Sequence, residues 1–283
     1  MKKICYILVS TLLLLSCNNT PIDLNVMSFN IRMDTSADSL NSWQYRKDVA
    51  AEIIKIKDAD IIGTQEVVIN QLNDLKSRLP EYNAIGVGRQ DGKELGEHCA
   101  IFYKKDRFKL IDSGNFWLSE SPLAAGVKGW DAACERVTTW GILEDIDSKK
   151  KVFVINTHLD HVGKIARQEG VTQLLHWADS LSNGLPIILT GDFNATPDSD
   201  VIKHVLDTSS SNTLVHTKDI AEIKDGLSGT YHNYGKIPTE KRDFIDYIFV
   251  SPKTKVKHHS VLPEKLNDIF ISDHAIVTAQ IQI

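Results

Sequence analysis

The chain has 283 residues, of which 42% are hydrophobic and 24% are charged. This composition suits one large globular domain or two small ones, and it excludes a disordered, collagen-like or disulfide-dense chain. The 32 Lys and Arg residues against 37 Asp and Glu residues give a net charge of −5, which weighs against a general polyanion binder with a basic face. A basic cleft on an acidic body remains compatible with this charge.

The first 16 residues have the pattern of a bacterial export signal, because Lys2 and Lys3 precede an apolar run over 4–15 that is too short for a membrane-spanning helix. The run ends in Leu-Leu-Ser-Cys, which resembles a bacterial lipobox. The resemblance implies cleavage before Cys17, lipidation of its thiol and a tether over 17–22. Removing the signal changes the net charge to −7. The alternatives are an ordinary secretory signal or an uncleaved anchor.

Two further cysteines, Cys99 and Cys134, belong to the predicted domain. Exported chains can form disulfides, but sequence provides no geometry for the pair. Cys99 lies in an apolar, strand-like stretch, so we interpret it as a small buried hydrophobic residue. The spacing is not that of a thiolate zinc site.

The hydrophobic pattern of the first half predicts strands that alternate with helices. Strands are predicted at 22–32, 60–66, 82–87, 99–103 and 108–112, and helices at 43–58 and 67–79. A Gly-rich, charged loop is predicted at 88–97 and irregular structure at 113–135.

The second half repeats this alternation. Strands are predicted at 137–146, 152–156, 186–189, 244–250, 256–262 and 275–281, and a helix at 162–181. Neither half offers a separate site and no linker divides them, so we expect a single α/β domain over 23–283 with two packed sheets and helices outside.

Polar side chains of ligand type occur where six of these strands begin or end, with Asp246 embedded in the strand over 244–250. They are Asn30, Glu66, His158 with Asp160, Asp192 with Asn194, Asp246, and Asp273 with His274. Strand ends of α/β sheets are where sites collect, and carboxylate and amide oxygens suit Mg²⁺, Mn²⁺ or Ca²⁺. Each residue alone could cap a turn or be a satisfied core histidine. The same pattern at six strand ends favours a site for chemistry at phosphorus.

Six segments in order resemble the motif set of the exonuclease–endonuclease–phosphatase superfamily, the deoxyribonuclease I-like fold. They are Met-Ser-Phe-Asn-Ile-Arg at 27–32, Gly-Thr-Gln-Glu at 63–66, Asn-Thr-His-Leu-Asp at 156–160, Gly-Asp-Phe-Asn at 191–194, Asp-Phe-Ile-Asp-Tyr-Ile at 243–248 and Ser-Asp-His at 272–274. The resemblance implies a four-layer α/β sandwich with a cleft at one edge of the paired sheets.

The resemblance also implies roles for individual residues. Glu66 resembles the principal Mg²⁺ ligand, supported by Asn30 and Asp273. Asp192 matches the carboxylate that orients or deprotonates the attacking water, and Asn194 matches its partner. His274 matches the histidine that contacts the scissile phosphate, with Asp246 orienting it, and His158 matches a second phosphate or leaving-group histidine.

Three neighbouring residues are assigned supporting roles. Arg136 resembles a phosphate-contacting arginine, with an ordinary ion-pair arginine as the alternative. Glu97 is a candidate acidic partner for His158, and Asp160 lies beside the histidine motif and could exchange roles with it. Position 32 is Arg where some nucleases of the superfamily carry an acid, which puts a second metal ligand there in doubt.

The residues therefore predict a phosphoesterase that uses Mg²⁺, or alternatively Mn²⁺, on phosphorylated sugars, glycans, lipids or nucleotides. A lipid-anchored monomer at the bacterial cell envelope is expected. The alternatives are a secreted or surface-tethered nuclease, although tight nucleic-acid binding is not favoured, and a non-catalytic surface protein, which would have lost a catalytic residue. Trp43, Trp117 and Trp130 are predicted either to form a cleft rim or to pack in the core.

Overall fold

The computed structural model describes residues 21–209 and 213–283. The predicted signal and Cys17 lie outside these residues and stay predictions. In the order of their pairing, the first sheet contains β10 (Ile223–Gly226), β12 (Lys255–Val261), β15 (Val277–Gln282), β1 (Asp23–Asn30), β2 (Ile61–Gln65), β4 (Ile101–Lys104) and β3 (Tyr82–Ile85). The second contains β5 (Phe108–Trp117), β6 (Val137–Asp145), β7 (Lys151–His158), β8 (Ile187–Asp192), β11 (Asp246–Val250) and β9 (Val215–His216).

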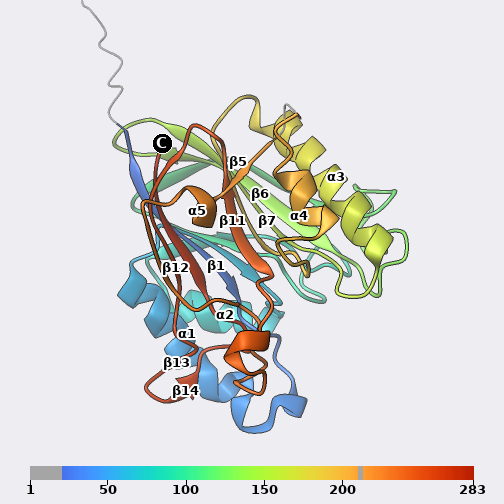
Figure 1. The fold of residues 1–283 in the computed structure, drawn as a ribbon, viewed down its shortest axis with the longest axis vertical. Helices are drawn as coiled ribbons and strands as arrows, with labels where there is room; N and C mark the ends of the chain where they lie inside the picture. The colour runs from blue at the N-terminus through green and yellow to red at the C-terminus, as the bar shows by residue number, and fades with distance from the viewer. Residues whose placement is uncertain (1–20, 210–212) are drawn as a thin grey trace, which may run out of the picture.

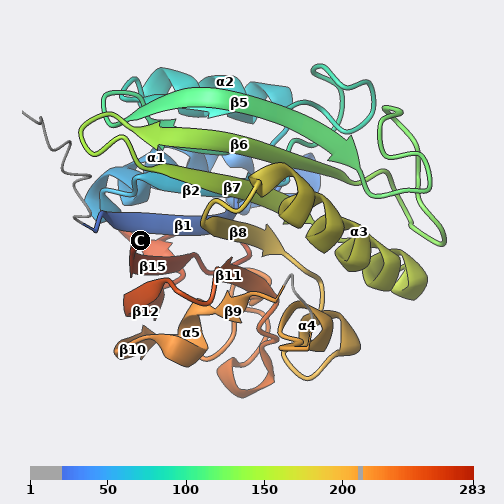
Figure 2. The ribbon, with the colours of Figure 1, turned by 90° about the horizontal axis from the view of Figure 1, so that it is seen from above.

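Helices cover the outer faces of the two sheets, as the predicted four-layer sandwich requires. They are α1 (Trp43–Lys57), α2 (Ile69–Arg78), α3 (Lys164–Ser182) and α4 (Asp200–Val205). The short α5 (Thr217–Ile220) instead contacts β12 of the first sheet and β9 and β11 of the second. Figure 1 shows α1 and α2 on one side of the strands and α3 and α4 on the other. Figure 2 shows the strands of the second sheet one below another from β5 to β11, with α3 beside them.

The alternation of side chains along β1 explains the layering. Leu24 and Val26 point into the core cluster shared with the second sheet, whereas Met27 and Phe29 belong to the cluster shared with α1 and α2. Successive side chains of a strand point to opposite faces of a sheet. A strand that is apolar on both faces must be covered on both, and β1 is covered by the second sheet on one face and by α1 and α2 on the other.

A buried polar network crosses between the sheets near the carboxyl end of β1. The side-chain amide of Asn156 donates to the carbonyl oxygens of Thr64 (2.8 Å) and Ala100 (3.1 Å). Its oxygen accepts from Gln65 Nε2 (2.7 Å) and Thr190 Oγ1 (3.0 Å). A Cβ at Gly63 would lie 1.9 Å from Thr190 Oγ1, so only glycine permits this close approach.

The predicted strands and helices are confirmed, with ends that differ by a few residues. The largest difference is β5, which continues to Trp117 through residues predicted to be irregular. Ser113, Gly114 and Asn115 carry no hydrophobic signal, but they pair with β6, where Gly114 faces the ring of Trp140. Tertiary pairing thus overrides weak local propensity.

Several short elements had no sequence signal long enough to find: α4, α5, β9, β10 and the hairpin of β13 (Lys265–Leu266) and β14 (Ile269–Phe270). Among the described residues, no helix has the length and apolar character needed to cross a membrane.

Candidate active site

The predicted site segments meet at one edge of the sandwich because of strand direction and register. β1 runs parallel to β2, and each ends at this edge, at Asn30 and just before Glu66. β7 runs parallel to β8, so His158 and Asp192 are register partners. β11 runs antiparallel to β8, which places its first residue, Asp246, opposite Asp192. Residues distant in sequence are thereby aligned on neighbouring strand ends.

These strand ends surround a cavity of about 630 Å³, within the size range of small-ligand sites. The predicted residues that line it are Glu66, Glu97, Arg136, His158, Asp192, Asn194, Asp273 and His274. Its other polar lining residues are Arg32, Arg89, Cys134, His161, Thr196, Tyr231 and Asp243. The remaining predicted residues, Asn30, Asp160 and Asp246, lie behind this lining and bond to residues that form it.

Asn30 holds two of the carboxylates in place. Its side-chain amide donates to Glu66 Oε1 and to Asp192 Oδ2, both at 2.9 Å. Its oxygen accepts the backbone N–H of Arg32 at 2.9 Å. The orientation therefore supports the acids rather than presenting the amide oxygen to a metal, which refines the metal-supporting role predicted for Asn30.

The donor set fits a hard divalent cation. Glu66, His158 and Asp192 present ligand atoms within 4.8 Å of one another, and oxygen-rich sets of this kind suit Mg²⁺ or Mn²⁺. Burial raises the pKa of Asp273, with the nearby Glu66 carboxylate adding to the effect while His274 opposes it. Buried acids that repel one another are stabilised by a bound cation.

Arg32 supplies a positive charge beside these acids without using their lone pairs. Its guanidinium lies 3.8 Å from both Glu66 Oε2 and Asp273 Oδ2, which is longer than a hydrogen bond. Its close partner is Asp38, at 2.9 Å from Nε. The residue that departs from the nuclease pattern thus stands between two predicted metal-site carboxylates, a position that sequence alone did not reveal.

Asp192 has the properties of a base poised near neutral pH. Burial, together with the neighbouring Asp246 carboxylate, raises its pKa to about 7, against the opposing effect of His274. The backbone N–H of Asn194 donates to Asp192 Oδ1 at 2.9 Å and fixes the carboxylate plane. A general base is most effective when its pKa lies close to the working pH.

His274 is set up to carry a positive charge. Burial disfavours its protonation, but Asp246, 2.8 Å from Nδ1, outweighs this effect and raises the pKa of His274 well above its usual range, aided by Asp192 and Asp273. The predicted His–Asp pair is therefore formed. An imidazolium in this position can stabilise negative charge on a phosphoryl group.

His158 has the opposite character. Burial and the charges of Arg136 and Arg89 lower its pKa well below the usual value, so the imidazole is neutral. The side-chain amide of Asn194 lies 3.1 Å from Nε2. Since that amide nitrogen is a donor, Nε2 accepts and Nδ1 carries the proton. Nδ1 is buried and has no hydrogen-bond partner among the described residues, so His158 is a neutral imidazole fixed through Nε2.

Glu97, the candidate acidic partner of His158, lies near that histidine but has a closer partner in Arg89. Its Oε2 lies 4.0 Å from His158 Nδ1, whereas Arg89 Nη1 contacts the same oxygen at 2.7 Å. Arg89 is part of the loop over 88–97, and its guanidinium competes successfully because it carries a permanent charge. Glu97 and Arg89 form an ion pair in the wall of the cavity.

Asp160 positions Arg136. The carboxylate accepts from the backbone N–H groups of Ala133, Val162 and Gly163 and from Arg136 Nε at 3.3 Å. A second nitrogen of the guanidinium lies 2.9 Å from His161 Nδ1. Both carboxylate oxygens of Asp160 are used in these hydrogen bonds, so its effect on the cavity is to position Arg136. Arg136 lines the cavity and suits a phosphate oxygen.

Aromatic residues at the site differ from those considered in the sequence. Trp43 and Trp117 are buried, with their indole N–H groups bonded to Asp74 and to the Arg89 carbonyl, and Trp130 does not line the cavity. Tyr231 does line it, with its ring centroid 4.9 Å from that of His274. Tyr231 lies in a loop without a hydrophobic pattern, so only the structure identifies it.

Cys99 is buried as predicted, and Cys134 is partly buried in the cavity wall; both are free thiols. Burial raises the pKa of each. Neither is an activated nucleophile, since that role requires a lowered pKa.

The fold and this constellation suit the hydrolysis of phosphoester bonds with the help of a divalent metal ion. A family model described as the Endonuclease/Exonuclease/phosphatase family matches residues 27–274. The chain belongs to this family, and the predicted superfamily and sandwich architecture are confirmed.

Solved structures of bacterial members are similar over nearly the whole chain. An endonuclease/exonuclease/phosphatase from Bacteroides vulgatus is 39% identical, with a TM-score of 0.89 over 92% of this chain and 98% of that one. A mannosyl-6-phosphatase from Bacteroides thetaiotaomicron is 37% identical, with a TM-score of 0.84 over 91% and 99%.

Among curated proteins, human Nocturnin is 28% identical over 262 residues, which cover 83% of this chain and 57% of Nocturnin. The chain spans between about a third and three fifths of the length of the curated relatives it matches.

Proposed function

We propose that this protein is a Mg²⁺-dependent phosphomonoesterase that acts on phosphorylated sugars or glycans. The observation that carries the proposal is the cavity in which Asp192, with its pKa near 7, lies 3.9 Å from the imidazolium of His274 and beside Glu66, a candidate metal ligand. The similarity to a mannosyl-6-phosphatase supports the sugar phosphate class.

In this proposal the chain's own groups bind the phosphate and accept the proton of the attacking water. Arg136 and His274 bind the phosphate oxygens, and Asn194 positions a water beside Asp192. Asp192 takes a proton as the water oxygen bonds to phosphorus, the bond from phosphorus to the ester oxygen breaks on the opposite side, and the leaving oxygen takes a proton from solvent water, to which Asp192 later releases its own. A cation held by Glu66, with Asp192 and Asp273 nearby, would supply charge neutralisation at the phosphate.

The test is hydrolysis of mannose 6-phosphate before and after treatment with EDTA. Activity is expected to vanish with EDTA and to return with Mg²⁺ or Mn²⁺. Asp192→Asn is expected to lower kcat by at least about a hundredfold. Asp200→Asn, the same change at an exposed position nearby, is the matched control. Turnover that persists without metal, or a near-normal rate for Asp192→Asn, would contradict the mechanism.

A nuclease remains the second candidate, since the family includes nucleases. An oligonucleotide in the same assay distinguishes the two: cleavage that exceeds monoester hydrolysis would favour the nuclease. A non-catalytic protein would have lost part of the machinery, yet the cavity retains Glu66, His158, Asp192 and His274.

We also propose attachment to the bacterial cell envelope through lipidated Cys17. The support is the lipobox-like sequence that ends the apolar run over 4–15. Metabolic labelling with a fatty acid is expected to mark the full chain and to fail with Cys17→Ser; equal labelling of both would refute the anchor.

A further inference from the structure

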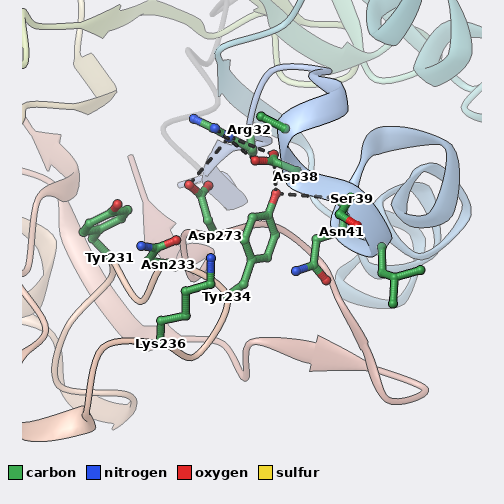
Figure 3. A pocket seen from close by; sticks show the side chains of 11 residues that line it. Arg32, Asp38, Ser39, Asn41, Tyr231, Asn233, Tyr234, Lys236 and Asp273 are labelled. Atoms are coloured by element: carbon green, nitrogen blue, oxygen red, sulfur yellow. Dashed lines mark hydrogen bonds and ion pairs between the residues drawn. The ribbon is translucent and has the colours of Figure 1, made fainter.

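A second cavity, of about 440 Å³, adjoins the catalytic cavity. The two share Arg32, Tyr231 and Asp273 as common walls. The rest of the second cavity is formed by residues 37–41 and by Asn233, Tyr234 and Lys236 (Figure 3). A ligand that occupies the catalytic cavity can thus extend directly into the second one.

The inner wall of the second cavity is a fixed polar network. Asp38 accepts from Arg32 Nε at 2.9 Å and from the Tyr234 hydroxyl at 2.9 Å, and Figure 3 shows that hydroxyl pointing toward Asp38. Behind it, the fully buried Arg46 donates to the carbonyl oxygens of Ile31 and Ile271. A wall so braced is preorganised, which lowers the entropic cost of binding a ligand.

Residues with a strained backbone conformation are concentrated around the two cavities. Of the twelve non-glycine residues with positive φ in the described part of the chain, six line one cavity or both: Arg32, Ser39, Glu66, Asn194, Asn233 and Tyr234. Non-glycine residues rarely adopt this conformation, and such strain clusters at functional sites. Ser39, Asn233 and Tyr234 line only the second cavity, so its strain is not explained by the catalytic machinery.

Beside this bonded network, four polar side chains of the second cavity are free for a ligand. Within the described residues, the side chains of Ser39, Asn41, Asn233 and Lys236 make no hydrogen bond or ion pair, although Asn41 and Asn233 are half-buried. An amide offers both a donor and an acceptor, which matches neighbouring hydroxyl groups. Only Ala37 and Leu40 among the lining residues lack polar side-chain atoms, which disfavours a lipid chain.

The in-line geometry of the reaction places the leaving alcohol of the substrate in the second cavity. Asp192, Asn194 and His158 line the catalytic cavity but not the second one, whereas Arg32, Tyr231 and Asp273 line both. An in-line displacement puts the leaving group opposite the attacking water. If the water lies beside Asp192, the leaving alcohol extends toward Arg32 and Tyr231.

We propose that the second cavity is the binding site for the sugar ring of the substrate, with Asn41 and Asn233 as the residues that select a polyhydroxylated leaving group. The proposal rests on the proposed phosphomonoesterase function. It adds a specificity site assembled from two segments nearly 200 residues apart.

The test compares two monoesters that share the phosphate but differ in the leaving group: mannose 6-phosphate and methyl phosphate. Asn233 has φ +47, so Asn233→Gly removes the amide without backbone strain. It is expected to lower the ratio of kcat/KM for mannose 6-phosphate to that for methyl phosphate by about tenfold. Asn267→Gly, at φ +50 in the exposed β13–β14 turn, is the matched control and should preserve the ratio.

Binding provides a readout that does not depend on turnover. Saturation-transfer NMR should show methyl mannoside bound to the unmodified chain and lost in Asn233→Gly. Unchanged ratios and binding would overturn the sugar subsite, and so would a selective loss of activity on a nucleoside 5′-monophosphate. Failure of the unmodified chain to hydrolyse either monoester would instead overturn the proposed function, so the two failures are distinct.

Discussion

The pair of Asp246 and His274 offers the sharpest test of the charge arrangement in the cavity. In Asp246→Asn, the amide oxygen can still accept from His274 Nδ1, so the 2.8 Å contact is kept while the negative charge is removed. Asp246 Oδ1 has no hydrogen-bond partner, so the NH₂ group that replaces it has no acceptor for its hydrogens. That group costs about 1–3 kcal/mol of stability, and folding must be checked by thermal unfolding.

The size of the effect follows from the contact. Loss of a charge at hydrogen-bond distance changes a pKa by roughly 1–3 units, which corresponds to about 1.4–4 kcal/mol of differential stabilisation of the imidazolium. Asp246 raises the pKa of His274, so the variant lowers it. If the imidazolium is the active form, the alkaline limb of kcat/KM against pH therefore moves down by roughly 1–3 units.

The assay is the pH dependence of kcat/KM for mannose 6-phosphate. Asp225→Asn is the control, because Asp225 forms a similar pair with His258 at 2.7 Å on the exposed surface. An alkaline limb that stays in place in Asp246→Asn would refute the charged role of His274. A uniform fall at every pH would show that Asp246 only orients the ring.

Two further predictions concern stability. Burial lowers the pKa of His216 to about 3 and that of His259 to about 4. Below about pH 6.5 the unfolded chain therefore binds more protons than the folded chain. As the pH falls, each histidine lowers the unfolding free energy by about 1.4 kcal/mol per pH unit. Urea unfolding at pH 7 and pH 5 should show this loss, and His216→Phe, within its cluster of aromatic rings, should weaken it; equal pH dependence would contradict the reasoning. Asn156→Leu should lower the unfolding free energy by about 3–5 kcal/mol, since it strips partners from Thr64, Gln65, Ala100 and Thr190, and an unchanged denaturation midpoint would refute this.

The sequence alone determined the fold and most of the residues that gather at the candidate site. Apolar runs such as those of β1 and β8 specify buried strands, because their side chains can be satisfied only in a core. The polar residues that end them, Asn30 and Asp192 among others, are local features of the chain. Their order along the sequence was sufficient to predict the sandwich, the family and the set of acids and histidines.

The tertiary structure decided which atoms meet. Sequence could not show that Asn30 bridges Glu66 and Asp192, or that Glu97 turns to Arg89, because these contacts depend on strand register and on competition among neighbours. The second cavity is the clearest case. Apart from Arg32 and Asp273, its walls come from residues 37–41 and 231–236, which lie outside the six motifs and come together only through long-range packing. The local hydrophobic pattern shows which side chains of a segment are buried. Strand register and long-range packing decide which residues of other segments those side chains contact.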